Sequence, residues 1–266
     1  MKKPLFLLLL AATLITACKK DNSSTPTPST STTLLTKITN NISGDPAYGK
    51  SFIEFSYNGK QLTKEVRYEY NKDGSVNNAQ TTTFNYDSKA NLTGTTISNS
   101  NPSRYVDYVS STITATGNTI SEIKLYAPNN VVADDIVFTY KDGKLSGSTS
   151  PLSGAVTYTY DANGNNTTGY GYGNEINKLF DSKNNLSGAL PYWVYFAYIQ
   201  FPDGYYQGVP LYPGTHNVLS FDHDNGANTT YSYQYNGFDY PSVSTSTVKD
   251  SNGHILSYTY QYTQVN

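Results

Sequence analysis

The chain has 266 residues, and its charge and composition exclude several classes of protein. Its 20 acidic residues outnumber its 18 basic ones, so it lacks the excess of positive charge typical of a protein that binds nucleic acid. Only 14% of the residues are charged, whereas 26 are Tyr and 20 are Gly. Such a composition, with abundant Thr, Ser and Asn, favours strands and turns over helices. We therefore expect an all-β fold and no nucleic-acid partner.

The N-terminus has the pattern of a bacterial lipoprotein signal peptide. Lys2 and Lys3 precede a short apolar stretch, and Ile15-Thr16-Ala17-Cys18 resembles a lipobox. The apolar stretch is shorter than the roughly 20 residues that span a bilayer. Cys18 is the only cysteine in the chain, which leaves it no disulfide partner and indicates a lipid attachment site. We predict that residues 1–17 are removed and that acylated Cys18 anchors the protein to a membrane. The alternative is a buried N-terminal helix that ends in a chance cysteine.

A polar segment follows the predicted lipid anchor. Residues 22–33, NSSTPTPSTSTT, contain no charged and no large apolar side chain, so they bury too little surface to offset the entropy of ordering. We predict that residues 18–33 are the lipidated cysteine and a flexible tether, and that residues 34–266 form a single domain. Lys19-Lys20-Asp21 resembles part of an export signal of surface lipoproteins, with one acid where that signal has two. The expected location is the outer membrane of a Gram-negative envelope, and either side of that membrane remains open.

One phrase, an aromatic residue followed by a turn, recurs along the predicted domain. Asp or Asn opens the turn through its side chain, and Gly or Asn then supplies a positive φ. We predict that each copy is one hairpin. Ala90 is a poor fit at the positive-φ position and indicates a different turn there. In chain order the copies are YNGK (57–60), YNKDG (70–74), YDSKANL (86–92), YKDGKL (140–145), YDANGN (160–165), FDSKNNL (180–186) and KDSNGHI (249–255).

The segments beside these turns alternate with a period of two residues, which is typical of half-buried antiparallel strands. The clearest are two tyrosine trios, Tyr231, Tyr233, Tyr235 and Tyr258, Tyr260, Tyr262, with Thr, Ser or Gln between them. Further strands are predicted at residues 52–57, 61–70, 81–86, 105–115, 119–126 and 136–140. The predicted fold is a long antiparallel β-meander of successive hairpins, curved or barrel-like, with the tyrosines on its inner face.

Several of these phrases resemble known families. Those with Tyr, Asp and Gly are loosely similar to the tyrosine-aspartate repeats of the RHS type, which build curved, shell-like sheets. Residues 180–186 (FDSKNNL), 215–220 (THNVLS) and 230–236 (TYSYQYN), the last followed by Tyr240-Pro241, carry a closer resemblance. It is to a group of uncharacterised Gram-negative lipoproteins with a porin-like fold. This resemblance runs from about Lys37 to the C-terminus and implies the fold, but it implies no activity.

Residues 187–214 interrupt the hairpin spacing and are strongly apolar. Periodicity does not separate a short helix from a buried strand in such a run. One hypothesis is a cap, in which a helical turn or loop closes one end of the sheet. The other is an exposed aromatic lip that stacks on a sugar or enters a lipid interface, since aromatic rings combine a large apolar area with a polar tip. The lip would consist of Trp193, Tyr195, Tyr198, Tyr205 and Tyr206.

Residues with catalytic or metal-binding chemistry are sparse. Consecutive strand residues face opposite sides, so Asp222 and Asp224 of the run Asp222-His223-Asp224 are the weak candidates for a shared metal. No serine lies in a G-x-S-x-G elbow, and no glycine-rich phosphate loop precedes a predicted helix. The glutamates in predicted strands are expected to face solvent: Glu54, Glu65, Glu69 and Glu122. We therefore expect no catalytic residue, no bound metal and no cofactor.

Two functions of different classes fit these patterns. The first is a lipid-anchored binding or structural module that contacts a glycan or an envelope protein through an aromatic surface. The second is an integral outer-membrane barrel, which needs an apolar band facing the lipid. The Thr- and Ser-rich strand 242–248, SVSTSTV, disfavours that band. A hydrolase is a third and weaker alternative.

Overall fold

The computed structural model describes residues 31–104, 107–167, 175–196, 209–212, 214–223, 226–249 and 253–266. The chain divides into two units, Met1–Thr30 and Ser31–Asn266. The predicted signal peptide, Cys18 and most of the predicted tether belong to the first unit and lie outside the described residues. Within the described ranges, no helix is both long and apolar enough to cross a bilayer.

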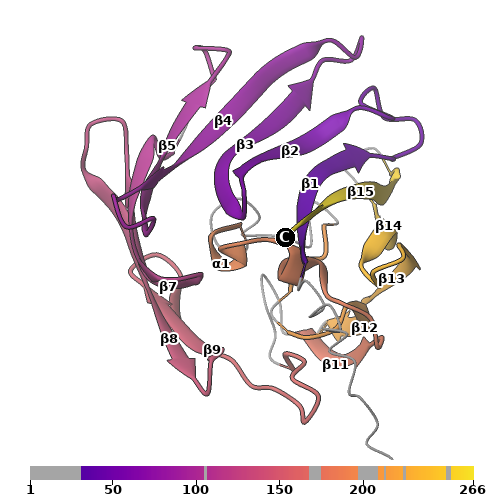
Figure 1. Cartoon of the computed structure of the whole chain (residues 1–266). Coiled ribbons are helices and arrows are strands. Elements are labelled where there is room, and N and C mark those ends of the chain that lie inside the picture. Colours follow the sequence, from indigo (N-terminus) through magenta and orange to yellow (C-terminus); the bar gives the residue numbers. More distant parts are fainter. Residues whose placement is uncertain are drawn as a thin grey trace, which may run out of the picture. The chain divides into compact units, whose positions relative to one another are not determined.

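The second unit is built on one antiparallel sheet of 15 strands. Each strand lies beside its sequence neighbour from β10 back to β1; β1 then pairs with β15, and the order continues from β14 to β11. The pairing of β1 with β15 joins the two ends of the domain, so the free edges are β10 and β11 and the sheet is not closed. In Figure 1 the strands follow one another around a curve. The predicted all-β meander is confirmed.

The strands are β1 (Thr32–Asn40), β2 (Ser51–Asn58), β3 (Gln61–Tyr70), β4 (Val76–Tyr86), β5 (Leu92–Asn99), β6 (Ser110–Thr116), β7 (Thr119–Tyr126), β8 (Val132–Lys141), β9 (Lys144–Ser150), β10 (Gly154–Thr157), β11 (Glu175–Phe180), β12 (Val218–His223), β13 (Asn228–Tyr235), β14 (Pro241–Lys249) and β15 (Ile255–Val265). A 3₁₀ helix, η1 (Leu186–Ala189), and one short helical turn, α1 (Trp193–Tyr195), lie between β11 and β12.

β1, β5 and β9 are among the strands that were not expected from the sequence. β1 begins at Thr32, within the predicted tether. It pairs with β2 and with the distant β15, and a pairing between the two ends of the domain leaves no local signal in the sequence. β5, LTGTTISN, and β9, KLSGSTS, contain few apolar residues, and their alternation is therefore weak. Pairing with strands on both sides holds them in the sheet.

One hairpin turn is repeated at residues 71–75, 87–91, 127–131, 161–165 and 236–240. In each, the N–H of the first residue donates to the carbonyl of the fifth, and the N–H of the fourth donates to the carbonyl of the first. The fourth residue has a positive φ, as in a type I turn closed by a left-handed residue. Ala90 has this conformation too, with φ 64°. The expectation of a different turn at Ala90 is therefore wrong.

The side chain of Asp87 explains why this turn tolerates Ala90. One carboxylate oxygen of Asp87 accepts hydrogen bonds from the N–H groups of Lys89, at 2.8 Å, and Asn91, at 2.9 Å. The other accepts from the side-chain amide of Asn91 at 2.9 Å. These three bonds hold the backbone on either side of Ala90, and surroundings of this kind can maintain a strained residue.

A tyrosine near the end of a strand anchors that strand to the previous one. The hydroxyl of Tyr86, at the end of β4, donates to the carbonyl of Leu62, near the start of β3, at 2.6 Å. Because neighbouring strands are antiparallel, the end of each strand lies beside the start of the one before it. The same bond, at 2.6–2.9 Å, joins Tyr57 to Leu35, Tyr70 to Ser51, Tyr140 to Ile120, Tyr160 to Leu145, Tyr233 to Val218 and Tyr262 to Pro241. The repeated phrase thus encodes an anchor as well as a turn.

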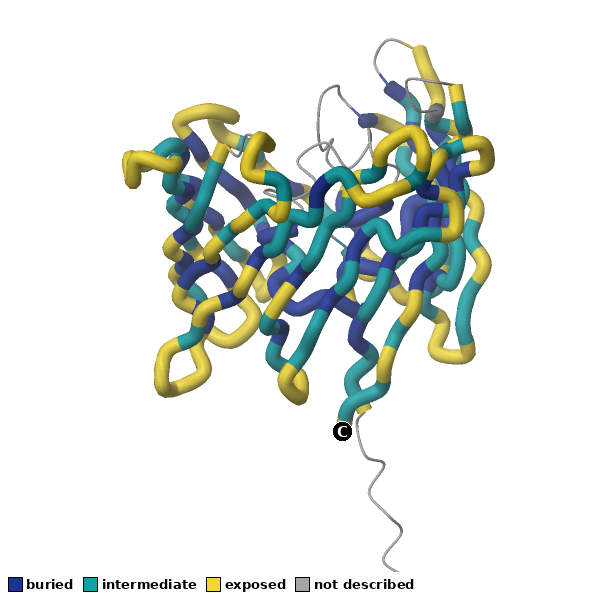
Figure 2. The backbone as a smooth tube through the Cα atoms, turned by 90° about the horizontal axis from the view of Figure 1, so that it is seen from above, coloured by how far each residue is buried: buried dark blue, intermediate teal, exposed yellow. Residues whose placement is uncertain are grey.

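Aromatic and aliphatic side chains of the strands form the core on the inner face of the sheet. Tyr258 and Tyr260 are each 3% exposed and belong to this core, as the alternation predicts. Figure 2 shows the exposed residues gathered in the turns at the strand ends. Tyr68 is an exception, since its hydroxyl donates to Glu54, which alternates with the buried Ile53 and Phe55 and so faces outward. The tyrosines therefore line the inside predominantly, though not everywhere.

Glu65 does not face solvent as expected but is buried, with 1% of its surface exposed. The register between β2 and β3 shifts next to Tyr57, which reverses the alternation of β3 and turns Glu65 inward. Its carboxylate lies 4.0 Å from the guanidinium of Arg67 on the same strand. Burial raises the pKa of Glu65, and the charge of Arg67 opposes that shift.

Candidate functional site

Residues 182–216 lie between β11 and β12, contain the apolar run 187–214 and are called the connecting segment below. In Figure 1, α1 lies inside the curve of the sheet. Phe196 is fully buried and meets Phe55 of β2 edge to face, with 5.4 Å between ring centroids. Tyr195 is also fully buried and meets Phe84 of β4 in the same way, at 5.5 Å. The connecting segment therefore completes the core on the inner face of the sheet.

These contacts change the predicted aromatic lip. Tyr195 belongs to the core, so its inclusion in an exposed surface is wrong: as the last residue of α1, it points its ring toward Phe84 of the sheet rather than toward solvent. Tyr198, Tyr205 and Tyr206 lie outside the described residues. Trp193 is half-buried and lines a pocket. Of the two lip residues that the structure describes, Trp193 is thus the one that is partly exposed.

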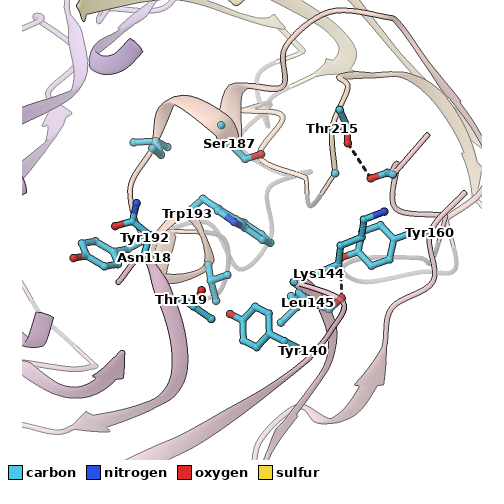
Figure 3. Close-up of a pocket in the computed structure, with 16 residues that line it drawn as sticks. Asn118, Thr119, Tyr140, Lys144, Leu145, Tyr160, Ser187, Tyr192, Trp193 and Thr215 are labelled. Carbon is cyan, nitrogen blue, oxygen red and sulfur yellow. Dashed lines mark hydrogen bonds between the residues drawn. The ribbon is translucent and has the colours of Figure 1, made fainter. Parts of the chain in front are cut away.

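The pocket beside Trp193 has a volume of about 430 Å³ (Figure 3). Its wall comes from the starts of β7 and β9, the end of β8, the turn before Asn165 and the connecting segment. The aromatic lining residues are Tyr140, Tyr160, Tyr192 and Trp193; the polar ones are Asn118, Thr119, Ser187 and Thr215; Lys144 is charged. In Figure 3 the indole of Trp193 lies between Tyr192 on one side and Tyr140 and Tyr160 on the other. Aromatic faces and small polar groups therefore converge on one space.

The aromatic wall is held in position by the strand anchors. Tyr140 donates its hydroxyl to the carbonyl of Ile120, and Tyr160 donates to that of Leu145, both at 2.8 Å. Burial raises the pKa of Tyr140 to about 12. Both hydroxyls thus remain neutral donors near neutral pH, and the rings keep their orientation in the absence of a ligand.

The wall of the pocket that faces Tyr140 and Tyr160 contains a residue with a strained backbone, Tyr192. Tyr192 has φ 56°, in the left-handed region that a bulky side chain rarely adopts. Its carbonyl accepts the N–H of Tyr195 at 2.8 Å, and its ring lies 6.5 Å from that of Tyr86. Tyr192 is the N-cap of α1, so this conformation starts the helical turn and places Trp193 against the pocket. Such strain persists where the surroundings enforce it, and it is frequent at ligand sites.

The C-terminal end of the connecting segment, at Thr215 and His216, is bonded to the turn at residues 161–165. His216 donates its N–H to the side-chain oxygen of Asn165 at 3.1 Å, and the hydroxyl of Thr215 lies 3.4 Å from the carbonyl of Gly164. Asn165 is itself held by Asp161, which accepts its side-chain amide at 3.0 Å. The rim of the pocket is therefore tied to the turn that follows free-edge strand β10.

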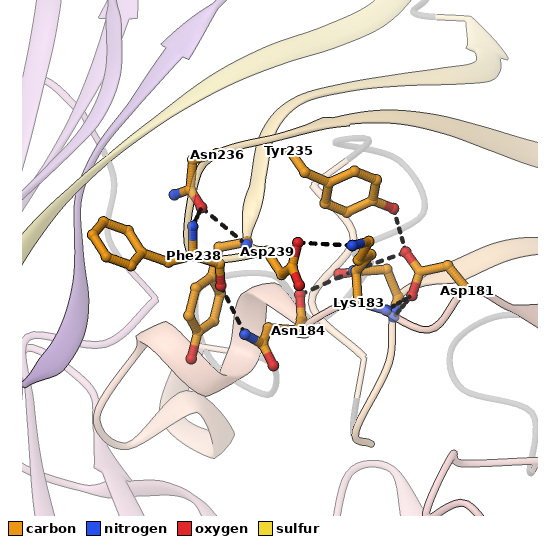
Figure 4. A network of polar contacts seen from close by, with 9 residues as sticks. Asp181, Lys183, Asn184, Tyr235, Asn236, Phe238 and Asp239 are labelled. Atoms are coloured by element: carbon orange, nitrogen blue, oxygen red, sulfur yellow. Dashed lines mark hydrogen bonds and ion pairs between the residues drawn. The ribbon is translucent and has the colours of Figure 1, made fainter. Parts of the chain in front are cut away.

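The start of the connecting segment is fixed by Asp181. The copy of the repeated phrase at residues 180–186 forms no hairpin of its own, so the prediction of one hairpin per phrase is wrong here. Instead, the N–H and the side-chain amide of Asn217 donate to the two carboxylate oxygens of Asp181, each at 3.0 Å. Tyr235 donates its hydroxyl to the same carboxylate, and Lys183 pairs with Asp239 at 2.8 Å (Figure 4). These contacts join the connecting segment to β13 and the turn after it.

The weak metal candidates do not come together in the described residues. Asp222 accepts the side-chain amides of Asn177, at 2.9 Å, and Asn228, at 2.8 Å. These bonds, that from Asn177 first, lower the pKa of Asp222. Asp224 lies outside the described residues. Over the described ranges, no group of three or more His, Cys, Asp or Glu side chains is placed to hold a metal ion.

Tyr140, Lys144 and Tyr160 were not expected at a site. Each belongs to a copy of the repeated phrase, where turn and strand chemistry explain it without a ligand. Their convergence on Trp193 depends on the path of the connecting segment, and no local pattern in the sequence records that path.

Comparison with known proteins assigns no family. No family model matches the sequence, and no curated protein matches it. Among solved structures, the chain is similar to a porin-like protein from Bacteroides uniformis, at 15% sequence identity and a TM-score of 0.37. That similarity covers 79% of this chain and 100% of the other.

Proposed function

We propose that this chain is a lipid-anchored envelope protein that binds a glycan in the pocket beside Trp193, and that it binds without catalysing a reaction. The observation that carries the proposal is the pocket itself, in which Trp193, Tyr140 and Tyr160 face a common space ringed by hydroxyl and amide groups. Sugar rings combine apolar faces with polar edges, and this lining offers a partner for both.

The size and rigidity of the pocket support the proposal. Its volume of about 430 Å³ falls within the range of roughly 300–1,000 Å³ that is usual for small-ligand sites. The hydroxyl bonds of Tyr140 and Tyr160 to backbone carbonyls hold the aromatic wall before any ligand arrives. A wall that is already ordered reduces the entropy that binding costs.

The N-terminal pattern supports the location. Cys18 follows a short apolar stretch and small residues, and acyl chains on it would moor the chain to a membrane. The polar segment after Cys18 leads to β1, which begins at Thr32. A tether of this kind would present the folded unit and its pocket beside the membrane surface, with the outer membrane of a Gram-negative cell as the proposed site.

A glycan array tests the binding proposal. The full chain, extracted in a mild detergent, should retain one class of glycans on the array. Trp193→Ala should weaken that binding by roughly tenfold or more, the equivalent of about 1.4 kcal/mol. Tyr48→Ala is the matched control, since Tyr48 is 57% exposed and lies outside the pocket. An empty array, or equal binding by the Trp193 variant and the unaltered chain, would contradict the proposal.

A further inference from the structure

Lys144 is the one charged side chain among the described residues that line the pocket. We propose that the glycan bound there carries an anionic group, a carboxylate or a sulfate, which pairs with the ammonium of Lys144. This inference rests on the proposed function and specifies the chemical class of the ligand.

The backbone places Lys144 at the mouth of the pocket. The hairpin between β8 and β9 turns through Asp142 and Gly143, whose φ values of 53° and 75° are those of a tight two-residue turn. Lys144 follows as the first residue of β9, and its ammonium lies 5.4 Å from the ring centroid of Tyr160. The ammonium is thereby directed over an aromatic wall of the pocket.

Gly164 leaves room for this ammonium. A Cβ atom built at Gly164 would lie 3.2 Å from Nζ of Lys144 and 2.6 Å from the hydroxyl oxygen of Thr215. Gly164 also has φ 85°, so the turn itself favours glycine. A side chain at this residue would therefore crowd Thr215 and Lys144, and glycine lets both lie close to the turn.

The charge of Lys144 has no counter-ion in the described part of the chain. Four lysines of the described ranges form ion pairs, three of them at hydrogen-bonding distance: Lys124 with Glu122 at 2.6 Å, Lys178 with Glu175 at 2.9 Å and Lys183 with Asp239 at 2.8 Å. Lys144 forms none of the ion pairs within the described ranges, and none of the pocket's described lining residues is acidic. An anion in the pocket would meet this cation without displacing a carboxylate.

The combined arrangement selects a ligand with an apolar face and an anionic edge. Trp193, Tyr140 and Tyr160 offer surfaces for the ring of a sugar, and Asn118, Thr119, Ser187 and Thr215 offer hydrogen bonds for its hydroxyls. Lys144 lies on the Tyr160 side. A uronic acid or a sulfated sugar unites these features, whereas a neutral sugar offers no anion to the exposed ammonium of Lys144.

Fluorescence measures the charge preference directly, because Trp193 is the only tryptophan in the chain. The full chain, in a non-aromatic detergent, is titrated with a galacturonic acid trisaccharide, a sulfated galactose trisaccharide and a neutral galactose trisaccharide. At least one acidic ligand should bind about tenfold more tightly than the neutral one, a difference of about 1.4 kcal/mol. The two acidic arms distinguish carboxylate from sulfate.

Three variants isolate the charge of Lys144. Lys144→Met should remove the preference for the acidic ligand while neutral binding changes little, and Lys144→Arg should preserve it. Lys141→Met is the control, because Lys141 pairs with Lys144 in the β8–β9 register but does not line the pocket. Equal affinity for acidic and neutral ligands, or an unchanged preference in Lys144→Met, would overturn the inference and leave glycan binding standing. No fluorescence change with any of the three trisaccharides, together with an empty array, would overturn both proposals.

Discussion

Asn217 donates two hydrogen bonds to the carboxylate of Asp181, one from its backbone N–H and one from its side-chain amide, each 3.0 Å long. The same two bonds join Asn91 to Asp87 and Asn165 to Asp161 within single turns. Asp181 and Asn217 are 36 positions apart, so the whole connecting segment occupies the place of a three-residue turn. The contact that closes an ordinary hairpin thus also holds the segment that builds the pocket.

Asp181→Ala should destabilise the domain by about 3 kcal/mol, because charge-assisted hydrogen bonds are lost from several donors at a partly buried site. The donors are the N–H groups of Lys183 and Asn217, the amide of Asn217 and the hydroxyl of Tyr235. Urea unfolding of the full chain in detergent measures the loss. Since the pocket depends on this segment, glycan binding should weaken as well.

Asp87→Ala is the matched control for Asp181→Ala. It removes the equivalent contact from an exposed turn whose ends are already neighbours in sequence. Its effect on unfolding should be clearly smaller, and glycan binding should stay unchanged. Equal losses from the two variants would show that Asp181 does no more than close a turn.

Ala90→Gly should stabilise the domain by about 1 kcal/mol. Ala90 has φ 64°, which costs an L-residue with a Cβ roughly 1–2 kcal/mol, and the greater freedom of glycine in the unfolded chain offsets part of the gain. Gly253→Ala supplies the reverse comparison, since Gly253 has φ 85° and open space around its Cβ position. Opposite shifts in the urea midpoint are expected. A loss of stability in Ala90→Gly would contradict this explanation of the turn.

The local parts of the fold could be predicted from the sequence, and the non-local parts could not. The period-two spacing of Tyr258, Tyr260 and Tyr262 is enough to predict a strand and the face of it that is buried. The inward turn of Glu65 depends on a register shift against β2, which no pattern within β3 reveals. The pocket is harder still to predict from the sequence. Tyr140 and Tyr160 precede separate turns, and Trp193 lies in the connecting segment, so the three residues are brought together by the fold alone.

Alkaline pH should weaken the fold, because the fold favours the neutral form of its buried tyrosines. Burial raises the pKa of Tyr140 from 10.0 to about 12. The contribution of Tyr140 to the free energy of unfolding is complete below pH 10. It is lost as the pH rises from 10 toward 12, because the tyrosine of the unfolded chain ionises at a lower pH than that of the folded chain. Unfolding in urea at about pH 9 and about pH 11 should show the decrease.

Tyr140→Phe isolates one part of that pH dependence. The variant should lose less stability than the unaltered chain between about pH 9 and pH 11, because it lacks the hydroxyl that ionises more readily in the unfolded chain than in the folded one. Tyr48→Phe, at an exposed position, should follow the unaltered chain. Identical pH dependence in Tyr140→Phe and the unaltered chain would show that the Tyr140 hydroxyl is not shielded as the structure places it.

Cys18→Ser should separate anchoring from folding. The proposed acyl chains need this thiol, so on that proposal the variant should appear in the soluble fraction after cell lysis and the unaltered chain in the membrane fraction. Its β-sheet circular dichroism should be unchanged, because the sheet begins at Thr32. Protease cleavage between Cys18 and Thr32 should likewise release the unaltered chain as a folded fragment. Membrane retention after either treatment would favour a chain integrated into the membrane.

A crystal structure of the chain soaked with its best-binding acidic trisaccharide tests the central claim most directly. We predict electron density for a sugar ring between Trp193 and the wall of Tyr140 and Tyr160, with the anionic group within hydrogen-bonding distance of Lys144. Density for the sugar elsewhere on the protein, with nothing bound beside Trp193, would contradict the proposed site.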